Sequence, residues 1–375
     1  MLVALSLLLN SLIVGMFLAW GWVLRQLLLR RPILSERPLV SRREVPWRGG
    51  TVLLVVLVSQ FVAYEIHGAY TLASGRMPGK PPVARAAAAE LTETEKMAVT
   101  ALTDLVLLVL LPVLVRLTSG ARLHDFGLSF EGWPRQAAVG IVAALIAAPS
   151  VYSVQSLALQ IWNNNEHPVQ KMLLKELSPG VPQLAIVSGI IMAPMFEELL
   201  FRGIFQSWLV RLIGRRAPAL PPPLRKPVIE LAERLADSSS SDPGSGAWKA
   251  DAQNGLAAQT PGGPDPALAA LPNSGWLAIV LTSLFFAVVH APQWPAPIAL
   301  FFLALVIGTV YQWTGSLIAV IFVHATFNGL STLAMFTVLL AGQSEEPNKT
   351  KVGWHAAAAT GSQVLIERGW MHQSS

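Results

Sequence analysis

The sequence predicts an all-α polytopic membrane protein that crosses the bilayer with about eight helices. Apolar residues make up 53% of the 375-residue chain and charged residues only 13%, whereas soluble globular proteins average roughly 45–50% and about 25%. Most of the apolar residues are gathered into runs long enough for a helix to span a bilayer. Cysteine is absent, which excludes disulfides, thiolate metal sites and cysteine nucleophiles.

Eight apolar runs predict the helices in order. The first has no basic residue at its start and no small-residue cleavage site before Arg25, so we expect an uncleaved membrane anchor. The sixth is short for a complete span. The two connections after it are tight, which predicts that the last three helices lie side by side. The predicted helices cover residues 1–24, 51–73, 97–117, 136–161, 183–213, 276–290, 298–313 and 316–341.

Basic residues predict the orientation and the environment. An arginine cluster from Arg25 to Arg48 fills the connection between the first two predicted helices. Such loops stay in the cytoplasm, which would place the amino terminus outside. The 27 basic and 22 acidic residues leave a modest excess without basic–aromatic alternation, so membrane lipids are expected partners and nucleic acid is not. The Ala-, Arg- and Pro-rich composition favours a multi-pass protein of the plasma membrane, here a bacterial inner membrane.

The chain is predicted to contain two helical regions, a linker and a tail. Residues 1–160 form the N-terminal transmembrane helices, and residues 183–341 carry the polar pairs on which the predicted chemistry depends. Pro, Gly and Ser dominate residues 214–274, which predicts a disordered cytoplasmic linker that interrupts the second region. Residues 342–375 are predicted to be a polar tail.

Three charged side chains, Glu197, Glu198 and Arg202, stand inside the fifth apolar run. Ionisable groups at membrane depth are costly unless they are paired or face a cavity. On a helix Glu198 and Arg202 are i and i+4, close enough to form an ion pair. The residue four positions after Glu197 is Phe201, which cannot form an ion pair. The Glu197 carboxylate is therefore available for acid–base chemistry. Pro194 predicts a break just before Glu197 that opens room for water.

Asp104 is a separate carboxylate inside the third apolar run. It is deep enough in that run to need an explanation. We expect a structural one, such as a polar side chain on a neighbouring helix.

Two more pairs of residues lie in the later runs. Phe286 and His290 are four residues apart, as are His324 and Asn328. A helix bundle can gather Glu197 and the polar members of these pairs around one cavity. Peptide hydrolysis needs a base for water, a proton donor for the leaving amine and hydrogen-bond donors for the oxyanion. This set of side chains can supply all three.

The conjunction of Glu-Glu-x-x-x-Arg, Phe-x-x-x-His and His-x-x-x-Asn, in that order on successive apolar segments, resembles the CPBP family of intramembrane proteases. That family includes Rce1-like CAAX-processing endopeptidases and Abi-type bacteriocin-immunity proteins. The resemblance covers about residues 183–340 without the linker. It implies an intramembrane endopeptidase that hydrolyses a peptide bond in a membrane-associated peptide or protein.

The resemblance also implies roles for single residues. Glu197, helped by His290, would activate water. His324 and Asn328 would form the oxyanion site. The implied supporting residues are Glu198 and Arg202, which would order their helix, and Phe286, which would hold the imidazole and exclude bulk water.

The alternative chemistry uses zinc. Glu197, His290 and His324 would supply a carboxylate and two imidazoles, an acceptable set for a catalytic zinc ion. His-Glu-x-x-His is absent from the chain. Asn328 next to His324 on the helix makes sense as a hydrogen-bond donor and much less as a zinc ligand, so we expect no cofactor.

Two other classes of function remain open from the sequence. A catalytically silent binding protein or immunity-type protein could use the same cavity to hold a peptide or partner. A transporter or proton relay also suits intramembrane Glu and His, but paired broken segments in two similar halves are missing.

Overall fold

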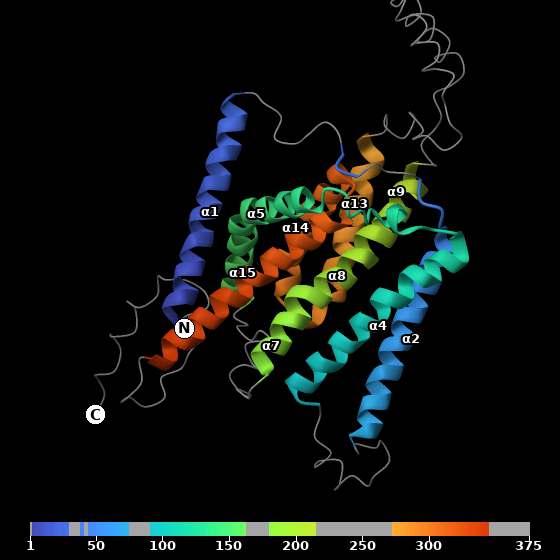
Figure 1. Cartoon of the computed structure of the whole chain (residues 1–375), viewed down its shortest axis with the longest axis horizontal. Coiled ribbons are helices and arrows are strands. Elements are labelled where there is room, and N and C mark those ends of the chain that lie inside the picture. Colours follow the sequence, from blue (N-terminus) through green and yellow to red (C-terminus); the bar gives the residue numbers. More distant parts are fainter. Residues whose placement is uncertain are drawn as a thin grey trace, which may run out of the picture.

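The computed structural model describes residues 2–29, 38–40, 44–74, 91–162, 180–214 and 272–344, and every regular element in these ranges is a helix (Figure 1). The predicted all-α fold is therefore confirmed. Most of the predicted linker and most of the predicted tail lie outside the described residues. Helix begins again at residue 272 and ends at residue 344, and the division of the chain into two regions, a linker and a tail stays a prediction.

Four long helices form the N-terminal region. Glu93–Ser119 begins at a capping box, in which the Glu95 amide donates to Thr92 Oγ1 at 3.2 Å and the Thr92 amide donates to Glu95 Oε2 at 2.8 Å. Such a cap satisfies amides that the first turn leaves open. The same helix ends at Gly120, whose φ of 73° suits glycine. The four helices are α1 (Leu2–Leu28), α2 (Gly49–Ala73), α4 (Glu93–Ser119) and α5 (Trp133–Trp162).

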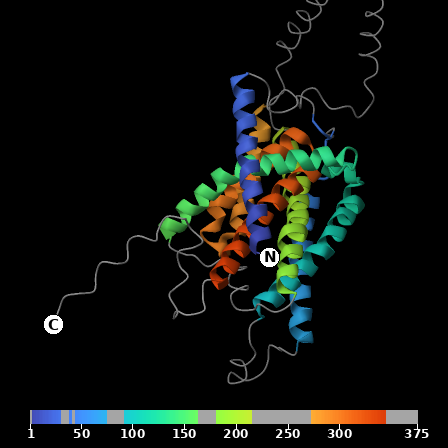
Figure 2. The ribbon, with the colours of Figure 1, turned by 60° about the vertical axis from the view of Figure 1, so that its left-hand side comes forward.

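The fifth predicted helix is one continuous rod (Figure 2), and two of its sections are π-helical. Pro194 lies at its centre and lacks the amide that an α-helical turn needs. Instead of one kink at this point, the rod contains a π-helical section on either side, a form that is frequent at functional sites. Its parts are α7 (Val181–Ile186), η2 (π, Val187–Met192), α8 (Ala193–Glu198), η3 (π, Leu199–Gln206) and α9 (Ser207–Gly214).

The C-terminal region contains the three predicted helices and one short turn. Helix α14 packs against α13, and both α14 and α15 pack against α5. Gly140 of α5 allows the close approach of α15, because a Cβ there would collide with the Ala319 carbonyl oxygen. The elements are α13 (Pro272–Val289), η4 (3₁₀, Ala291–Gln293), α14 (Ala296–Thr314) and α15 (Leu317–Ser344).

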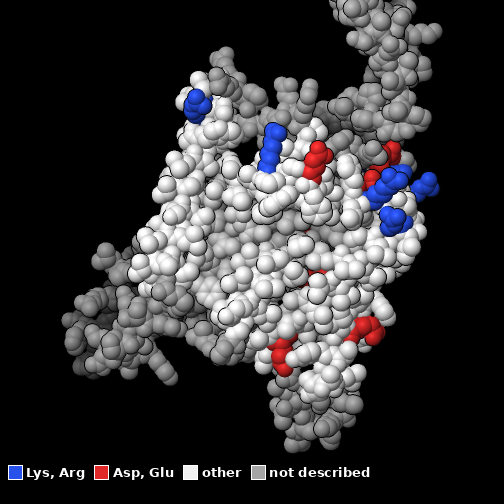
Figure 3. Space-filling model, in the orientation of Figure 1, with Lys and Arg blue, Asp and Glu red and all other residues white. Residues whose placement is uncertain are grey.

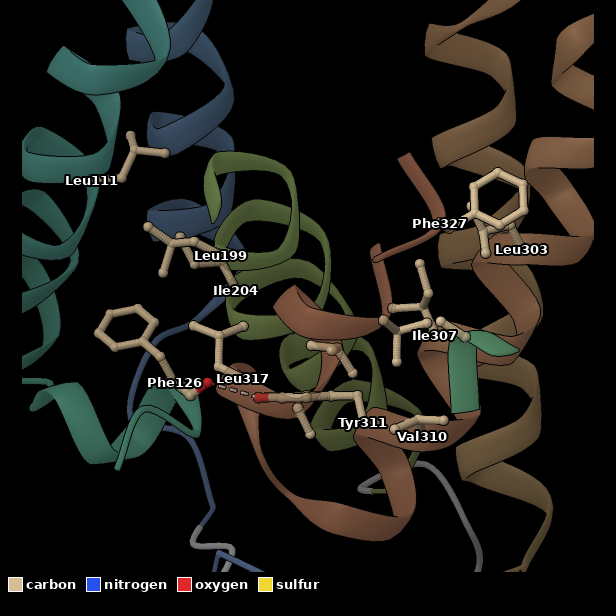
Figure 4. Packing of buried hydrophobic residues seen from close by; sticks show 14 of the residues in the cluster. Leu111, Phe126, Leu199, Ile204, Leu303, Ile307, Val310, Tyr311, Leu317 and Phe327 are labelled. Carbon is tan, nitrogen blue, oxygen red and sulfur yellow. Dashed lines mark hydrogen bonds between the residues drawn. The ribbon is translucent and has the colours of Figure 1, made fainter. Parts of the chain in front are cut away.

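The apolar core lies between the rod and its neighbours (Figure 4). Phe126, from the 3₁₀ turn η1 (Leu123–Phe126), is buried there, and its carbonyl accepts a hydrogen bond from the Tyr311 hydroxyl at 3.0 Å. Gly127 follows with φ of 79°, and a Cβ at this position would strike the Gly315 carbonyl. These contacts join the short turn after α4 to the α14–α15 hairpin.

In the part of the chain that the structure describes, seven helices are long and apolar enough to cross a membrane, and α13 is shorter, as the sequence predicts for the sixth segment. Figure 3 shows a broad surface that is almost free of charged residues, with one small acidic spot near its centre. On this face Lys and Arg are confined to the upper part, and the charged residues at the lower end are acidic. This asymmetry agrees with the predicted orientation, which remains a prediction.

Candidate active site

A buried charged cluster fixes the rod to its neighbours. Arg202 Nη1 donates to Glu198 Oε1 at 3.1 Å, so the predicted i,i+4 ion pair is present, and both side chains are fully buried. His324 Nδ1 lies 2.7 Å from the same Oε1. Arg202 Nη2 also donates to the Ala304 carbonyl of α14 at 3.2 Å. Glu198 therefore connects the rod to α15, a contact beyond the helix-ordering role implied by the resemblance.

Glu197 points into a different environment from its neighbour in the chain. Its side chain is 19% exposed, and its two oxygens lie 3.9 Å from His290 Nε2 and 3.8 Å from His324 Nε2. These separations are too long for direct hydrogen bonds, and at such distances a bridging water must be considered. Glu197 Oε2 has no hydrogen-bond partner among the described residues. The structure thus brings Glu197, His290 and His324 together around a carboxylate oxygen, Glu197 Oε2, that can still accept a hydrogen bond.

Both imidazoles are held through Nδ1. His290 Nδ1 lies 2.8 Å from the Phe286 carbonyl, and His324 Nδ1 lies 2.7 Å from the Glu198 carboxylate. Because carbonyl and carboxylate oxygens accept, each Nδ1 carries the hydrogen. In the neutral ring Nε2 then has the free lone pair, and in both histidines it is Nε2 that faces Glu197. Such outer hydrogen bonds fix both tautomer and orientation.

Phe286 lies at the centre of this arrangement. Its ring is fully buried, with the His290 ring centroid at 4.6 Å and the His324 ring centroid at 5.9 Å. Arg202 Cζ lies 5.0 Å from the Phe286 centroid, within the range of a cation–π contact. Phe286 thus touches both imidazoles and the buried cation, which agrees with its predicted supporting place.

Asn328 reaches the rod through a carbonyl that Pro194 leaves unbonded. In η2 the Ala193 amide donates to the Ser188 carbonyl, five residues back. The next bond of this series would join residue 194 to Gly189, but proline has no amide hydrogen. Asn328 Nδ2 donates to that Gly189 carbonyl at 2.8 Å. The structure thus shows a carbonyl near Pro194 that is exposed to a side chain of α15, and the room for water next to Glu197 stays a prediction.

Two of these contacts were missed by the sequence reasoning, and one expected contact is absent. The carbonyls of Gly189 and Ala304 accept from site side chains, but backbone acceptors carry no signal in a residue pattern. The neighbouring Pro194 was the only signal for Gly189. The polar partner expected for Asp104 is not found, since this buried residue has no hydrogen bond or ion pair with any described residue.

The alternative zinc set has no preformed geometry. Among the described residues, no group of three or more His, Asp or Glu side chains is spaced to hold a metal ion. His324 Nδ1 is occupied by Glu198, and His290 Nδ1 by Phe286. The Nε2 atoms and Glu197 are the donors that a metal would use, and they would have to move to take it.

Comparison with known proteins adds one finding about the family. Residues 262–330 match the model of the Rce1-like family, described as type II CAAX prenyl endopeptidase Rce1-like. This segment is less than a fifth of the 375-residue chain and includes the second and third motifs but not the first. Neither the curated proteins nor the solved structures gave a match to the chain. The match agrees with the resemblance carried by the three motifs, since residues 262–330 are similar to Rce1-like type II CAAX prenyl endopeptidases. The long apolar helices make the chain a multi-pass membrane protein.

Proposed function

We propose that the chain is an intramembrane endopeptidase in which Glu197 and His290 activate the hydrolytic water. The observation that carries the proposal is the orientation of the three side chains, since Glu197 Oε2 has no partner and the Nε2 atoms of both histidines face this carboxylate. A water between Glu197 and His290 would donate one hydrogen to each. The family supports proteolysis in the membrane as the activity.

Hydrolysis then proceeds through a proton carried by Glu197. As the water oxygen bonds to the peptide carbonyl carbon, its proton passes to the Glu197 carboxylate. As the C–N bond breaks, the same proton passes to the leaving nitrogen. One water is consumed for each bond cut, and Glu197 returns to its initial state.

His324 and Asn328 would stabilise the oxyanion. Since His324 Nδ1 donates to Glu198, a second donor at Nε2 requires the imidazolium form, and the Glu198 carboxylate stabilises that form. Asn328 gives one amide hydrogen to Gly189 and has a second for the substrate. The charges also balance, because Glu198 compensates Arg202 and Glu197 compensates a protonated His324. A balanced set reduces the cost of burying charge.

The mechanism uses no metal. Prolonged chelation of the purified protein should therefore leave cleavage unchanged. Loss of cleavage on chelation, with recovery on adding zinc, would favour Glu197, His290 and His324 as zinc ligands.

We propose a membrane-associated peptide or protein as the substrate. The helices that carry the site are apolar enough to span a bilayer or, for α13, lie beside such helices. The plasma membrane, in a bacterium the inner membrane, is the proposed location, with membrane lipids as surroundings. Fractionation of cells expressing the chain, followed by immunodetection, tests this location.

The test of the function compares peptide termini newly formed in membranes that contain the native chain or the Glu197→Gln variant. Glutamine keeps the volume and removes the base, so we expect cleavage to fall by about 10²- to 10⁴-fold with unchanged amounts of folded protein. Glu65→Gln, in the exposed part of α2, is the matched control and should cleave normally. If native and Glu197→Gln membranes yield the same termini, the binding or immunity-type function replaces the protease.

A further inference from the structure

Gln206 is a buried amide on the rod, at the last position of η3. Only 1% of the residue is exposed. Its Nε2 donates to the Gly308 carbonyl of α14 at 3.0 Å, but its Oε1 has no hydrogen-bond partner among the described residues. A buried acceptor without a partner costs stability, so stability alone is a poor explanation for glutamine at this place. Buried groups of this kind call for a functional explanation.

Gln206 and Arg202 make two parallel contacts with the same helix. Arg202 Nη2 donates to the Ala304 carbonyl at 3.2 Å, and Gln206 Nε2 donates to the Gly308 carbonyl at 3.0 Å. The two donors are four residues apart on the rod, and the two acceptors are four residues apart on α14. A single contact leaves a helix free to turn about it, whereas two contacts along its length oppose both rotation and sliding. The two contacts therefore set the register of the rod against α14.

Helix α14 has the small residues that these contacts require. Ala304 and Gly308 form a small-xxx-small pair, which lets two membrane helices approach closely. A Cβ at position 308 would lie 3.0 Å from Gln206 Oε1 and 3.1 Å from Ile279 Cγ2 of α13. Both separations are shorter than an ordinary van der Waals contact. Glycine at 308 therefore leaves the room that the Gln206 amide occupies next to α14.

A neighbouring pair of hydroxyls does not replace the Gln206 contact. Ser207 Oγ lies 3.1 Å from the Tyr311 hydroxyl of α14. Each hydroxyl has one hydrogen to donate, and Tyr311 gives its hydrogen to the Phe126 carbonyl. Ser207 can donate either to Tyr311 or to the Arg202 carbonyl of its own helix, which lies at 3.0 Å. A hydrogen that can change acceptors holds the register less firmly than the amide of Gln206 does.

The register matters because the site is assembled across the same helices. Arg202 gives Nη1 to Glu198 Oε1 and Nη2 to the Ala304 carbonyl, and the same Glu198 oxygen holds His324 Nδ1 at 2.7 Å. A movement of the rod along α14 would therefore strain either the contact with Ala304 or the contact with His324. A displacement of about 1 Å in a catalytic site can lower the rate about 10²-fold. Gln206 lies eight residues beyond Glu198, so it would act through the rod.

We propose that Gln206 is a positioning residue of the site, which fixes the register of the rod against α14 through the Gly308 carbonyl and thereby holds Glu198 against His324. The effect on the rate rests on the proposed proteolysis, whereas the register does not depend on it. Without the Gln206 amide, the Arg202–Ala304 contact remains as a pivot about which the rod can turn.

The first test measures the register without a cleavage assay. The chain has no cysteine, so spin labels attach only at Ile191→Cys of the rod and Phe302→Cys of α14, two exposed positions. In Gln206→Met, whose side chain is also unbranched but cannot donate, the distribution of label distances should shift or broaden. Gly308→Ala should reproduce this change, and Gln60→Met, at an exposed glutamine of α2, is the matched control. An unchanged distribution in both Gln206→Met and Gly308→Ala would overturn the proposal.

The second test separates positioning from packing by kcat and KM, measured on the substrate that the comparison of peptide termini identifies. Gln206→Met should lower kcat about 10- to 100-fold and leave KM near its native value, because no group that binds substrate has changed. Gln60→Met should keep both constants. A native kcat in Gln206→Met would overturn the positioning role, as would a loss of turnover that the loss of folded protein explains entirely. If the native chain cleaves nothing while the label distances respond to Gln206→Met, the protease function fails and the register contact stands.

Discussion

Glu197 and Glu198 are neighbours in the chain with opposite surroundings. Glu198 is fully buried and bound on two sides, by Arg202 Nη1 at 3.1 Å and His324 Nδ1 at 2.7 Å. Glu197 is 19% exposed, and one of its oxygens has no hydrogen-bond partner among the described residues. Successive residues of a helix differ by about 100° in direction, so the Glu198 carboxylate meets Arg202 and His324, whereas the Glu197 carboxylate faces the Nε2 atoms of His290 and His324. The same residue type therefore serves as scaffold or as candidate base according to the direction in which its side chain points.

The largest effect is expected from a substitution of Glu198, the carboxylate with the structural role. Glu198→Gln removes the charge that compensates Arg202, and breaking a buried pair in this way costs about 3–5 kcal/mol. Folded yield in detergent and the thermal unfolding midpoint should both fall. Glu197→Gln is the matched control, because its side chain is partly exposed and makes no ion pair shorter than 3.8 Å. If the two variants are equally stable, Glu198 does not stabilise the fold more than Glu197 does.

A second expected effect concerns the oxyanion side. Asn328→Ala removes the proposed donor, and the loss of one such donor lowers kcat by about 10²- to 10³-fold. It also leaves the Gly189 carbonyl without its partner, so we expect a stability loss of about 1 kcal/mol. Cleavage and thermal unfolding, measured on the same preparation, check both numbers. Asn328→Asp is the control, since it keeps the size but has no donor when ionised and should be equally inactive.

A smaller effect is expected at Pro194. Pro194→Ala supplies the amide hydrogen that η2 lacks, so the Gly189 carbonyl can be bonded within the rod and Asn328 is released. We expect cleavage to fall by less than it does in Asn328→Ala, without a loss of stability. Native cleavage in Pro194→Ala would mean that the Gly189 contact does not position Asn328.

The smallest expected effect uses an exposed ion pair. Arg211 Nε lies 2.9 Å from Glu44 Oε1, but the Glu44 side chain is 43% exposed. Exposed pairs contribute about 0–1 kcal/mol, so Glu44→Gln should barely change the unfolding midpoint. A large fall of the unfolding midpoint would show that burial does not explain why the Glu198–Arg202 pair is expected to contribute more stability than the Glu44–Arg211 pair.

Much of the fold was available from the sequence because the bilayer imposes simple rules. A helix that crosses it needs a long apolar run, and within the described ranges seven such runs correspond to helices of sufficient length. The Glu198–Arg202 contact was predictable because it lies within one helix, where spacing fixes proximity. The resemblance to the family followed from motifs of the same local kind.

The sequence by itself determined the all-α membrane fold, the short sixth helix and the i,i+4 ion pair, since each depends on hydrophobic length or on spacing within a helix. Tertiary structure decided that His324 binds Glu198 and that Asn328 binds the Gly189 carbonyl that Pro194 leaves without an amide partner. These contacts join residues more than 90 positions apart. Their geometry depends on how the helices pack, and no local pattern records the side of a helix that a distant helix will cover.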